Sequence, residues 1–192
     1  MHKDVLKVLL TQEELKAKVE ELGKQITEDY KGKTPVVISV LKGSFIFVSD
    51  LVRSMDVDTE LDFMVVSSFT GVVSSGAVRI IKDIAISLAG RDVLVVEDIL
   101  DSGLTLEYIS EILRGRDAKS VKIATLLDKP SRRKASIVPD YVGFTVPDEF
   151  VVGYGLDYNE LYRNLPYIGI LKPEVYSDVD AEIINKQKEE TV

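Results

Sequence analysis

The organisation of this chain is clearest in residues 93–105, which read VLVVEDILDSGLT. A short apolar run rich in valine is typical of a strand buried on both faces, as in a parallel sheet. The run ends at Glu97 and Asp98, and the turn over 101–105 leads into a helix predicted for 105–115. Such a strand, tip and helix form one unit of an open α/β sheet, in which ligands bind beyond the carboxyl ends of the strands.

Strands and helices alternate on both sides of this unit. Strands are predicted over 36–41, 61–66, 78–81, 92–96 and 121–127, and helices over 12–30 and near 45–52. The pattern predicts an α/β fold with an open, mostly parallel sheet flanked by helices on both faces. After Pro130 only short strands are predicted, over 141–146, 150–152 and 167–171, which indicates an appended subdomain.

Composition excludes several kinds of chemistry. The chain has 192 residues, no cysteine, and His2 as its only histidine, which argues against a Ser-His-Asp triad and against cysteine or histidine metal sites. Any acid-base chemistry must then use carboxylates, lysine, tyrosine or a hard cation such as Mg2+. The net charge of -8 argues against nucleic-acid binding as the main role. No apolar run is long enough for a membrane span, and the N-terminus does not resemble a signal peptide, so we expect a cytoplasmic protein.

The turn after the acidic strand tip predicts a phosphate site. Ser102, Gly103 and Thr105 place hydroxyl groups and free N–H groups at a helix N-terminus, which favours a phosphate. Glu97 and Asp98 would repel that phosphate, so they need sugar hydroxyls or a cation as partners. An ordinary helix cap explains any one of these residues alone, but a ribose phosphate accounts for the whole string.

This string resembles the phosphoribosyl-pyrophosphate motif of type I phosphoribosyltransferases, and the flanking segments over 35–173 resemble the hypoxanthine-guanine phosphoribosyltransferases. The resemblance implies a purine-salvage enzyme that joins hypoxanthine or guanine to the ribose of phosphoribosyl pyrophosphate, with Mg2+ as cofactor. It implies that Glu97 and Asp98 hold the ribose hydroxyls, directly or through Mg2+. The 5'-phosphate would be held by Asp101, Ser102, Gly103, Leu104 and Thr105. Asp101 would also be the general base near purine N7.

Two loops resemble the family's pyrophosphate-binding parts. In the first, Lys42 and Gly43 are expected to bind pyrophosphate, and the peptide between Leu41 and Lys42 is expected to be cis. The second is the lid, where the family commonly has Ser-Tyr and this chain has Ser68 and Phe69. The phenol hydroxyl is therefore absent, which leaves the backbone of both residues for pyrophosphate.

The resemblance also implies a base-binding hood over about 140–173 together with the N-terminal segment, beside a core over about 35–130, all within a single domain over 1–192. The polar tail over 178–192 is expected to fray. Within the hood, Phe150 would stack on the purine, Val151 would offer backbone hydrogen bonds, and Asp157 would lie near the base and a second Mg2+. Two basic side chains complete the predicted site. Lys129 would bind the purine 6-oxo group, and Arg163 would bind pyrophosphate.

Two alternatives share the sugar-phosphate motif. One is a phosphoribosyltransferase for xanthine or a pyrimidine, and the other is a regulatory protein that senses phosphoribosyl pyrophosphate and binds nucleic acid. Lys129 and the hood favour 6-oxopurines, while the acidic balance and the retained Asp101 and Arg163 count against a regulator. We therefore expect small-molecule substrates, no nucleic-acid or membrane partner, and a homodimer or homotetramer by resemblance to the family.

Overall fold

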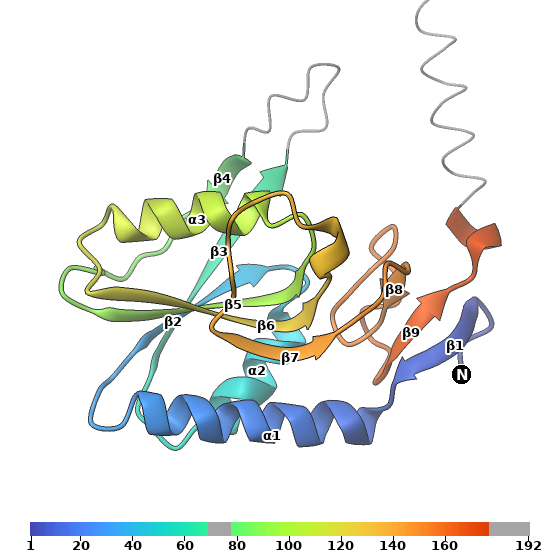
Figure 1. The fold of residues 1–192 in the computed structure, drawn as a ribbon, viewed down its shortest axis with the longest axis horizontal. Helices are drawn as coiled ribbons and strands as arrows, with labels where there is room; N and C mark the ends of the chain where they lie inside the picture. The colour runs from blue at the N-terminus through green and yellow to red at the C-terminus, as the bar shows by residue number, and fades with distance from the viewer. Residues whose placement is uncertain (69–77, 177–192) are drawn as a thin grey trace, which may run out of the picture.

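The computed structural model describes residues 1–68 and 78–176. Its core is a six-stranded sheet with the order β4-β3-β2-β5-β6-β7 (Figure 1). The strands are β2 (Val36–Leu41), β3 (Glu60–Ser68), β4 (Val78–Lys82), β5 (Asp92–Leu100), β6 (Ser120–Asp128) and β7 (Tyr141–Thr145). Neighbouring strands are parallel except for β4, which is antiparallel to β3. The predicted open, mostly parallel α/β fold is confirmed.

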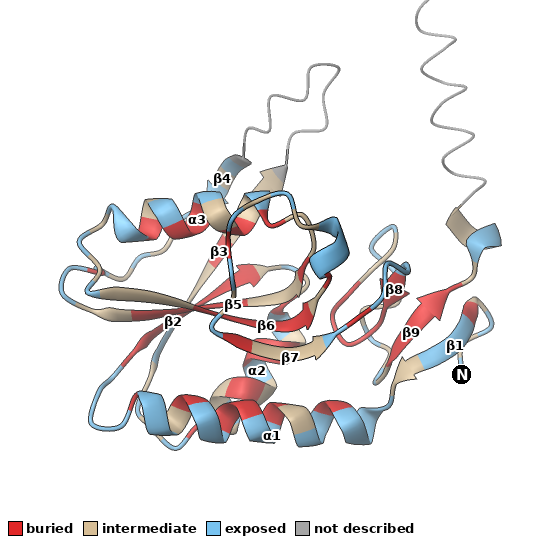
Figure 2. Ribbon diagram, in the orientation of Figure 1, coloured by how far each residue is buried: buried red, intermediate tan, exposed pale blue. Residues whose placement is uncertain are grey.

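Helices cover both faces of the sheet, as expected. Helices α1 (Gln12–Asp29) and α2 (Phe45–Arg53) lie on one face and α3 (Leu104–Arg114) lies on the other (Figure 1). Strand β5 shows why its central run, residues 93–96, is apolar at every position. Its side chains alternate, so that Leu94 and Val96 join the cluster with α1 and α2 while the intervening valines join the cluster with α3. The centre of the sheet is therefore buried on both faces (Figure 2).

Helix α1 begins at a capping box. The Thr11 hydroxyl accepts the N–H of Glu14 at 3.2 Å, and the Glu14 carboxylate accepts the N–H of Thr11 at 2.8 Å. These two bonds satisfy donors that the first turn of a helix leaves unpaired. None of the helices in the described ranges is long and apolar enough to cross a membrane.

A second, three-stranded antiparallel sheet lies at one end of the core and forms the hood. It is built from β1 (Val5–Leu10), β9 (Ile168–Leu171) and β8 (Val151–Val152), in the order β1-β9-β8 (Figure 1). Strand β1 was not predicted, because most of its side chains are exposed or half-buried and the segment lacks strict alternation. Its identity as a strand comes from pairing with β9, 160 residues away in the sequence, between partners such as Val8 and Gly169.

Two boundaries differ from those expected. Strand β7 was assigned to the appended subdomain, but it pairs in parallel with β6 and is the edge strand of the main sheet. Its start is fixed by Tyr141, which is 2% exposed and whose hydroxyl donates to Asp29 on α1 at 2.6 Å. Strand β5 was expected to end at Val96, but pairing with β6 continues to Leu100. The two acidic residues at its tip are therefore held within the sheet.

Candidate active site

The predicted site residues meet at the carboxyl ends of β2, β5 and β6. These three strands are adjacent and parallel, so the loops that follow them emerge at the same edge of the sheet. A cavity of about 200 Å3 opens at the tip of β5. It is lined by Glu97, Asp98, Ile99, Leu100, Asp101, Ser102, Gly103, Thr105 and Leu106. One cavity thus collects the acidic pair and nearly all of the predicted phosphate loop.

The predicted phosphate loop leads into α3 through a glycine. Gly103 is the N-cap, with φ at 81°, and Leu104 is the first helical residue. A side chain at Gly103 would meet Ile137 at 2.9 Å, so glycine is required by both the backbone angle and the space. The carbonyl of Ser102 accepts the N–H groups of Lys134 and Ala135 at 2.9 and 3.1 Å. The loop is therefore held rigidly while the first N–H groups of α3 remain available to an anion.

The acidic pair has no ion-pair partner in the described part of the chain. Burial raises the pKa of Glu97 well above its ordinary value, and the neighbouring charge of Asp98 adds to this effect. Burial also raises the pKa of Asp98 to about 6, although its carboxylate accepts the N–H of Ile99 at 2.8 Å and Arg163 lies near enough to lower it. In residues 1–68 and 78–176 neither carboxylate has an ion pair. This arrangement suits sugar hydroxyls or a divalent cation, both of which stabilise the ionised form.

The predicted pyrophosphate loop follows β2 and packs directly on this pair. The peptide between Leu41 and Lys42 is cis, as the family resemblance predicts. A side chain at Gly43 would lie 1.7 Å from Oδ2 of Asp98, so only glycine lets the loop approach the strand tip this closely. The Lys42 ammonium, 3.0 Å from a carboxylate oxygen of Glu160, joins the loop to the hood.

Arg163 lies in a cluster of hood carboxylates. Its guanidinium is 2.8 Å from Asp157 and 3.2 Å from Glu160, and it also donates to the carbonyl of Gly155 at 2.8 Å. Hydrogen bonds from Lys42 and Arg163 hold the pKa of Glu160 below its ordinary value. The Nε atom of Arg163 is buried without a partner in the described part of the chain. Sequence reasoning did not single out Glu160, and its place three residues before Arg163 was the only available signal.

Lys129 and the start of β8 form the side of the site assigned to the base. Lys129 follows β6, is only 6% exposed, and donates from Nζ to the carbonyl of Glu149 at 2.6 Å. Burial lowers its pKa, opposed in part by the charge of Asp101. Phe150 is 39% exposed, whereas Val151 is buried in the core.

Asp101 makes an ion pair that the sequence did not predict. Nε of Arg132 is 2.8 Å from Oδ1 of Asp101, and Nη1 of Arg132 is 3.3 Å from Asp148 in the segment before β8. Arg132 ends a short 3-10 helix, η1 (Pro130–Arg132), directly after Lys129. The Asp101 oxygen is buried and, within the described residues, lacks a well-oriented hydrogen bond. Arg132 thus forms an ion pair with Asp101, while Oδ1 of Asp101 can still accept a hydrogen bond.

The predicted lid residues, Ser68 and Phe69, lie at the edge of the described range. Ser68 is the last residue of β3, but its side chain and all of Phe69 lie outside the described residues, as does the tail over 178–192.

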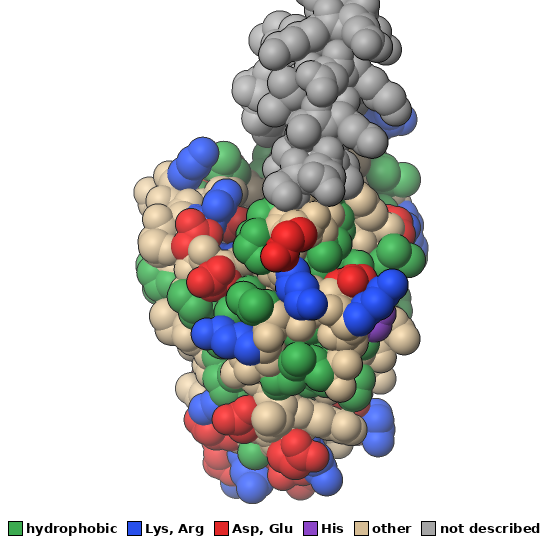
Figure 3. Space-filling model, turned by 90° about the vertical axis from the view of Figure 1, so that its right-hand side faces the viewer, with side chains coloured by type: hydrophobic (Ala, Val, Ile, Leu, Met, Phe, Trp, Pro, Cys, Tyr) green, Lys and Arg blue, Asp and Glu red, His purple; other side chains and the backbone are tan. Residues whose placement is uncertain are grey.

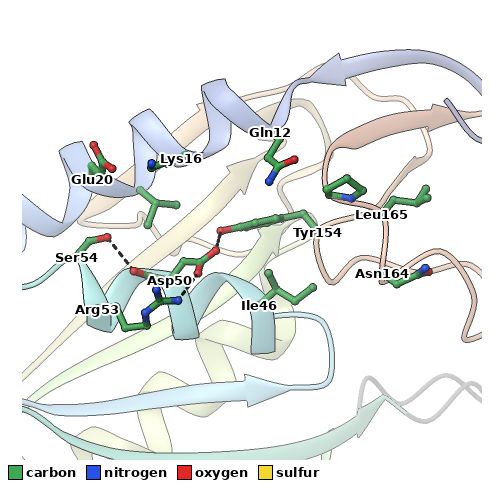
Figure 4. A pocket seen from close by; sticks show the side chains of 12 residues that line it. Gln12, Lys16, Glu20, Ile46, Asp50, Arg53, Ser54, Tyr154, Asn164 and Leu165 are labelled. Atoms are coloured by element: carbon green, nitrogen blue, oxygen red, sulfur yellow. Dashed lines mark hydrogen bonds and ion pairs between the residues drawn. The ribbon is translucent and has the colours of Figure 1, made fainter.

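A larger cavity in the described part of the chain lies elsewhere. It measures about 580 Å3 and is bounded by α1, α2 and the hood loops around Tyr154 and Leu165 (Figure 4). At its wall, Asp50 accepts the Tyr154 hydroxyl at 2.6 Å and lies 3.4 Å from Arg53. The cavity holds none of the predicted site residues. The Tyr154 hydrogen bond joins the hood to α2.

The surface at the hood end has no single charge. Figure 3 shows lysine, arginine, aspartate and glutamate side chains intermixed over the described part of this face. A nucleic-acid surface would instead concentrate positive charge.

Three comparisons place the chain among known proteins. Residues 6–159 match the family model of the phosphoribosyl transferase domain. The hypoxanthine-guanine phosphoribosyltransferase of Bacillus subtilis is 59% identical over 177 residues, which cover 92% of this chain and 98% of that protein. The bifunctional protein TilS/HprT of Listeria monocytogenes is also 59% identical, over 93% of this chain, but the chain spans only 28% of its length. A crystal structure of a Staphylococcus aureus hypoxanthine phosphoribosyltransferase superposes with a TM-score of 0.89 at 57% identity, covering 92% of this chain and 97% of that one.

Proposed function

The chain belongs to the phosphoribosyltransferase family, and we propose that it transfers the 5-phosphoribosyl group from phosphoribosyl pyrophosphate to hypoxanthine and guanine. The products would be IMP or GMP and pyrophosphate, which is a purine-salvage reaction. One observation carries the proposal. The free N–H groups of α3 share a cavity with Glu97, Asp98 and Asp101, at the edge of the sheet where Lys129 follows β6.

The ribose phosphate is bound at the strand tip. The N–H groups over 102–105 bind the 5'-phosphate, and Glu97 and Asp98 accept hydrogen bonds from the ribose hydroxyls. As the bond from the anomeric carbon to pyrophosphate breaks, positive charge develops on the ribose. The nearby carboxylates stabilise that charge in a partly desolvated site.

Asp101 acts as the general base. It takes the proton from purine N7 while N9 forms its bond to the anomeric carbon. Asp101 is paired with Arg132, and its action as a base requires this ion pair to break. Both groups are about half exposed, and an ion pair of this kind costs only about 0 to 1 kcal/mol to break.

The leaving pyrophosphate is bound between two loops. The backbone of Lys42 and Gly43 lies beside Asp98, and the Arg163 guanidinium provides a planar fork that matches phosphate oxygens. When pyrophosphate binds, its oxygens replace the carboxylates of Asp157 and Glu160 as partners of Arg163. The backbone of Ser68 and Phe69 completes this subsite.

Glu97 and Asp98 would hold a Mg2+ ion, and Asp157 would hold a second one. The fit rests on the pair at the strand tip, which has no ion pair in the described ranges and whose pKa values are raised. When bound, such an ion would offset the negative charge that develops on the pyrophosphate oxygens. Two carboxylates are enough for Mg2+, because water and substrate oxygens usually complete its coordination.

The purine is bound between the core and the hood. Lys129 donates to the 6-oxo oxygen in place of the Glu149 carbonyl, which lies 2.6 Å from it in the free protein. Phe150 stacks on the ring, and the Val151 backbone and Asp157 bind its polar edge.

The family and the absence of a membrane-spanning helix in the described residues support a cytoplasmic enzyme with small-molecule substrates. By the same family argument, the enzyme forms a homodimer or homotetramer.

The test is a nucleotide-formation assay with phosphoribosyl pyrophosphate and Mg2+, in which hypoxanthine, guanine, xanthine and uracil are supplied separately. We expect product with the first two bases. Asp101→Asn should fold like the wild type, judged by circular dichroism and Tm, and lower kcat about 10²-fold. Asp58→Asn, which removes an exposed carboxylate from the loop before β3, should leave kcat unchanged. Full activity of the Asp101 variant would refute its role as the base.

A further inference from the structure

The aromatic ring proposed to stack on the purine is itself held by two tyrosines. The rings of Phe150 and Tyr176 are stacked, with centroids 5.2 Å apart and planes at 23°. Tyr158 meets Phe150 edge-on, with centroids 5.3 Å apart and planes at 89°. Phe150 nevertheless remains 39% exposed. Tyr176 therefore covers one face of the ring, and part of its surface stays open to a ligand among the described residues.

The turn that carries Tyr176 is bound firmly to the hood. This helical turn, over 173–176, follows β9 and lies beside the hood sheet (Figure 1). The N–H of Lys172, just before the turn, donates to the carbonyl of Asp4 at 2.9 Å. The N–H of Val175 donates to the carbonyl of Lys172 at 3.0 Å, which closes the turn. Backbone bonds therefore fix the end of the described chain to its beginning.

The side chains of the turn make the same connection. Val175 and Tyr176 pack against the buried cluster of Val5, Val152 and Leu171, which is the core of the hood. The N–H of Leu171 donates to the carbonyl of Phe150 at 2.8 Å. The backbone of Phe150 and the ring stacked on it are therefore positioned by the same sheet. Tyr176 adds a second, rigid support for the ring.

We propose that Tyr176 is a base-positioning residue, which holds the Phe150 ring so that its opposite face meets the purine. The inference rests on the proposed function, in which Phe150 stacks on the base. A ring that is already immobilised loses less conformational entropy when a ligand stacks on it. Stacked aromatic pairs have coupling energies that correspond to about a 2- to 10-fold change in an equilibrium constant. The effect should appear in binding of the base, not in the chemistry at the ribose.

Three variants of the whole chain test this role. Tyr176→Ala removes the stacked ring, Tyr176→Phe keeps it, and Val175→Ala weakens the same turn without touching the stack. We expect Tyr176→Ala to raise KM for hypoxanthine about 2- to 10-fold, with KM for phosphoribosyl pyrophosphate and kcat unchanged. Calorimetric titration with IMP should show the same increase in Kd. Tyr176→Phe and Val175→Ala should behave like the wild type.

Other outcomes overturn the inference. An unchanged KM for hypoxanthine in Tyr176→Ala means that Phe150 needs no support, and a lowered KM means that Tyr176 competes with the base. An equal loss in Val175→Ala means that only docking of the turn matters. These three results leave the proposed function intact, because the wild type still makes nucleotide. A wild-type protein that makes no nucleotide and binds no IMP overturns both.

Discussion

The contact between Gly43 and Asp98 gives the sharpest test of the proposed site. In Gly43→Ala the new methyl group would lie 1.7 Å from Oδ2 of Asp98, where ordinary van der Waals contact needs at least 3.4 Å. The two groups must therefore separate by more than about 1 Å. The loop moves away from the strand tip, or the carboxylate turns away from the ribose. Both displacements separate groups that the proposed mechanism needs together.

A displacement of this size has a large kinetic effect. A misplacement of about 1 Å can cost about 10²-fold in rate, because reacting groups must be held in a narrow range of geometry. We expect kcat/KM for phosphoribosyl pyrophosphate to fall about 10²-fold in Gly43→Ala. The assay is steady-state nucleotide formation with each substrate varied in turn. KM for hypoxanthine should change much less, because the base is bound by Lys129 and the hood.

The matched control is Gly115→Ala at the C-terminal end of α3. A methyl group there would meet only the carbonyls of Glu111 and Ile112, both at 3.5 Å, and the backbone is in the ordinary helical region. This variant should keep full activity. Gly43→Ala with activity within twofold of the wild type, and with an unchanged fold, would show that the close approach to Asp98 has no part in catalysis.

Two further predictions concern the base site and the stability of the core. Lys129→Ala should raise KM for hypoxanthine and guanine more than KM for phosphoribosyl pyrophosphate in the same assay, and equal effects would indicate a structural lysine. The Tyr141 hydroxyl and the Lys122 ammonium, 2.6 and 3.0 Å from Asp29, hold its pKa below the ordinary value. That stabilisation is present above about pH 4 and is lost as the pH falls through the lowered pKa. In urea titrations Asp29→Asn should therefore lose up to about 1 kcal/mol at pH 7 and progressively less below pH 4, and a loss independent of pH would refute the ionic contribution.

Much of the main sheet is predictable because its strands are buried on both faces. Such strands must be apolar at every position, and the run before Glu97 has this property. The capping box at Thr11 is equally local, since its partners are three residues apart. Local patterns of this kind need no knowledge of the fold.

The remaining elements depend on contacts between segments far apart in the sequence. Strand β1 is half-exposed and becomes a strand only through β9. Strand β7 belongs to the main sheet because it pairs with β6, and Tyr141 joins its start to α1. The ion pairs of Arg132 and Glu160 are of the same kind. Both are exposed charged residues whose types and spacing resemble those of any solvated loop. Their partners are known only from the folded structure, in which the hood lies beside the strand tips.

The charged groups of the proposed site differ in their ion pairing, and this difference affects substrate binding. Arg163 and Lys42 already have carboxylate partners, and Asp101 has Arg132. Most of these groups are exposed or half-exposed, and such ion pairs contribute about 0 to 1 kcal/mol each, so an anionic substrate can displace them at little cost.

The acidic pair at the tip of β5 differs, because no cation in the described ranges pairs with it and burial raises both pKa values. Binding phosphoribosyl pyrophosphate alone would bring more negative charge to these two carboxylates. Their ionised forms become favourable only if sugar hydroxyls and a cation arrive together with the phosphates. The same acidic tip that repels a bare anion therefore selects a substrate that carries hydroxyl donors and a divalent ion beside its phosphates.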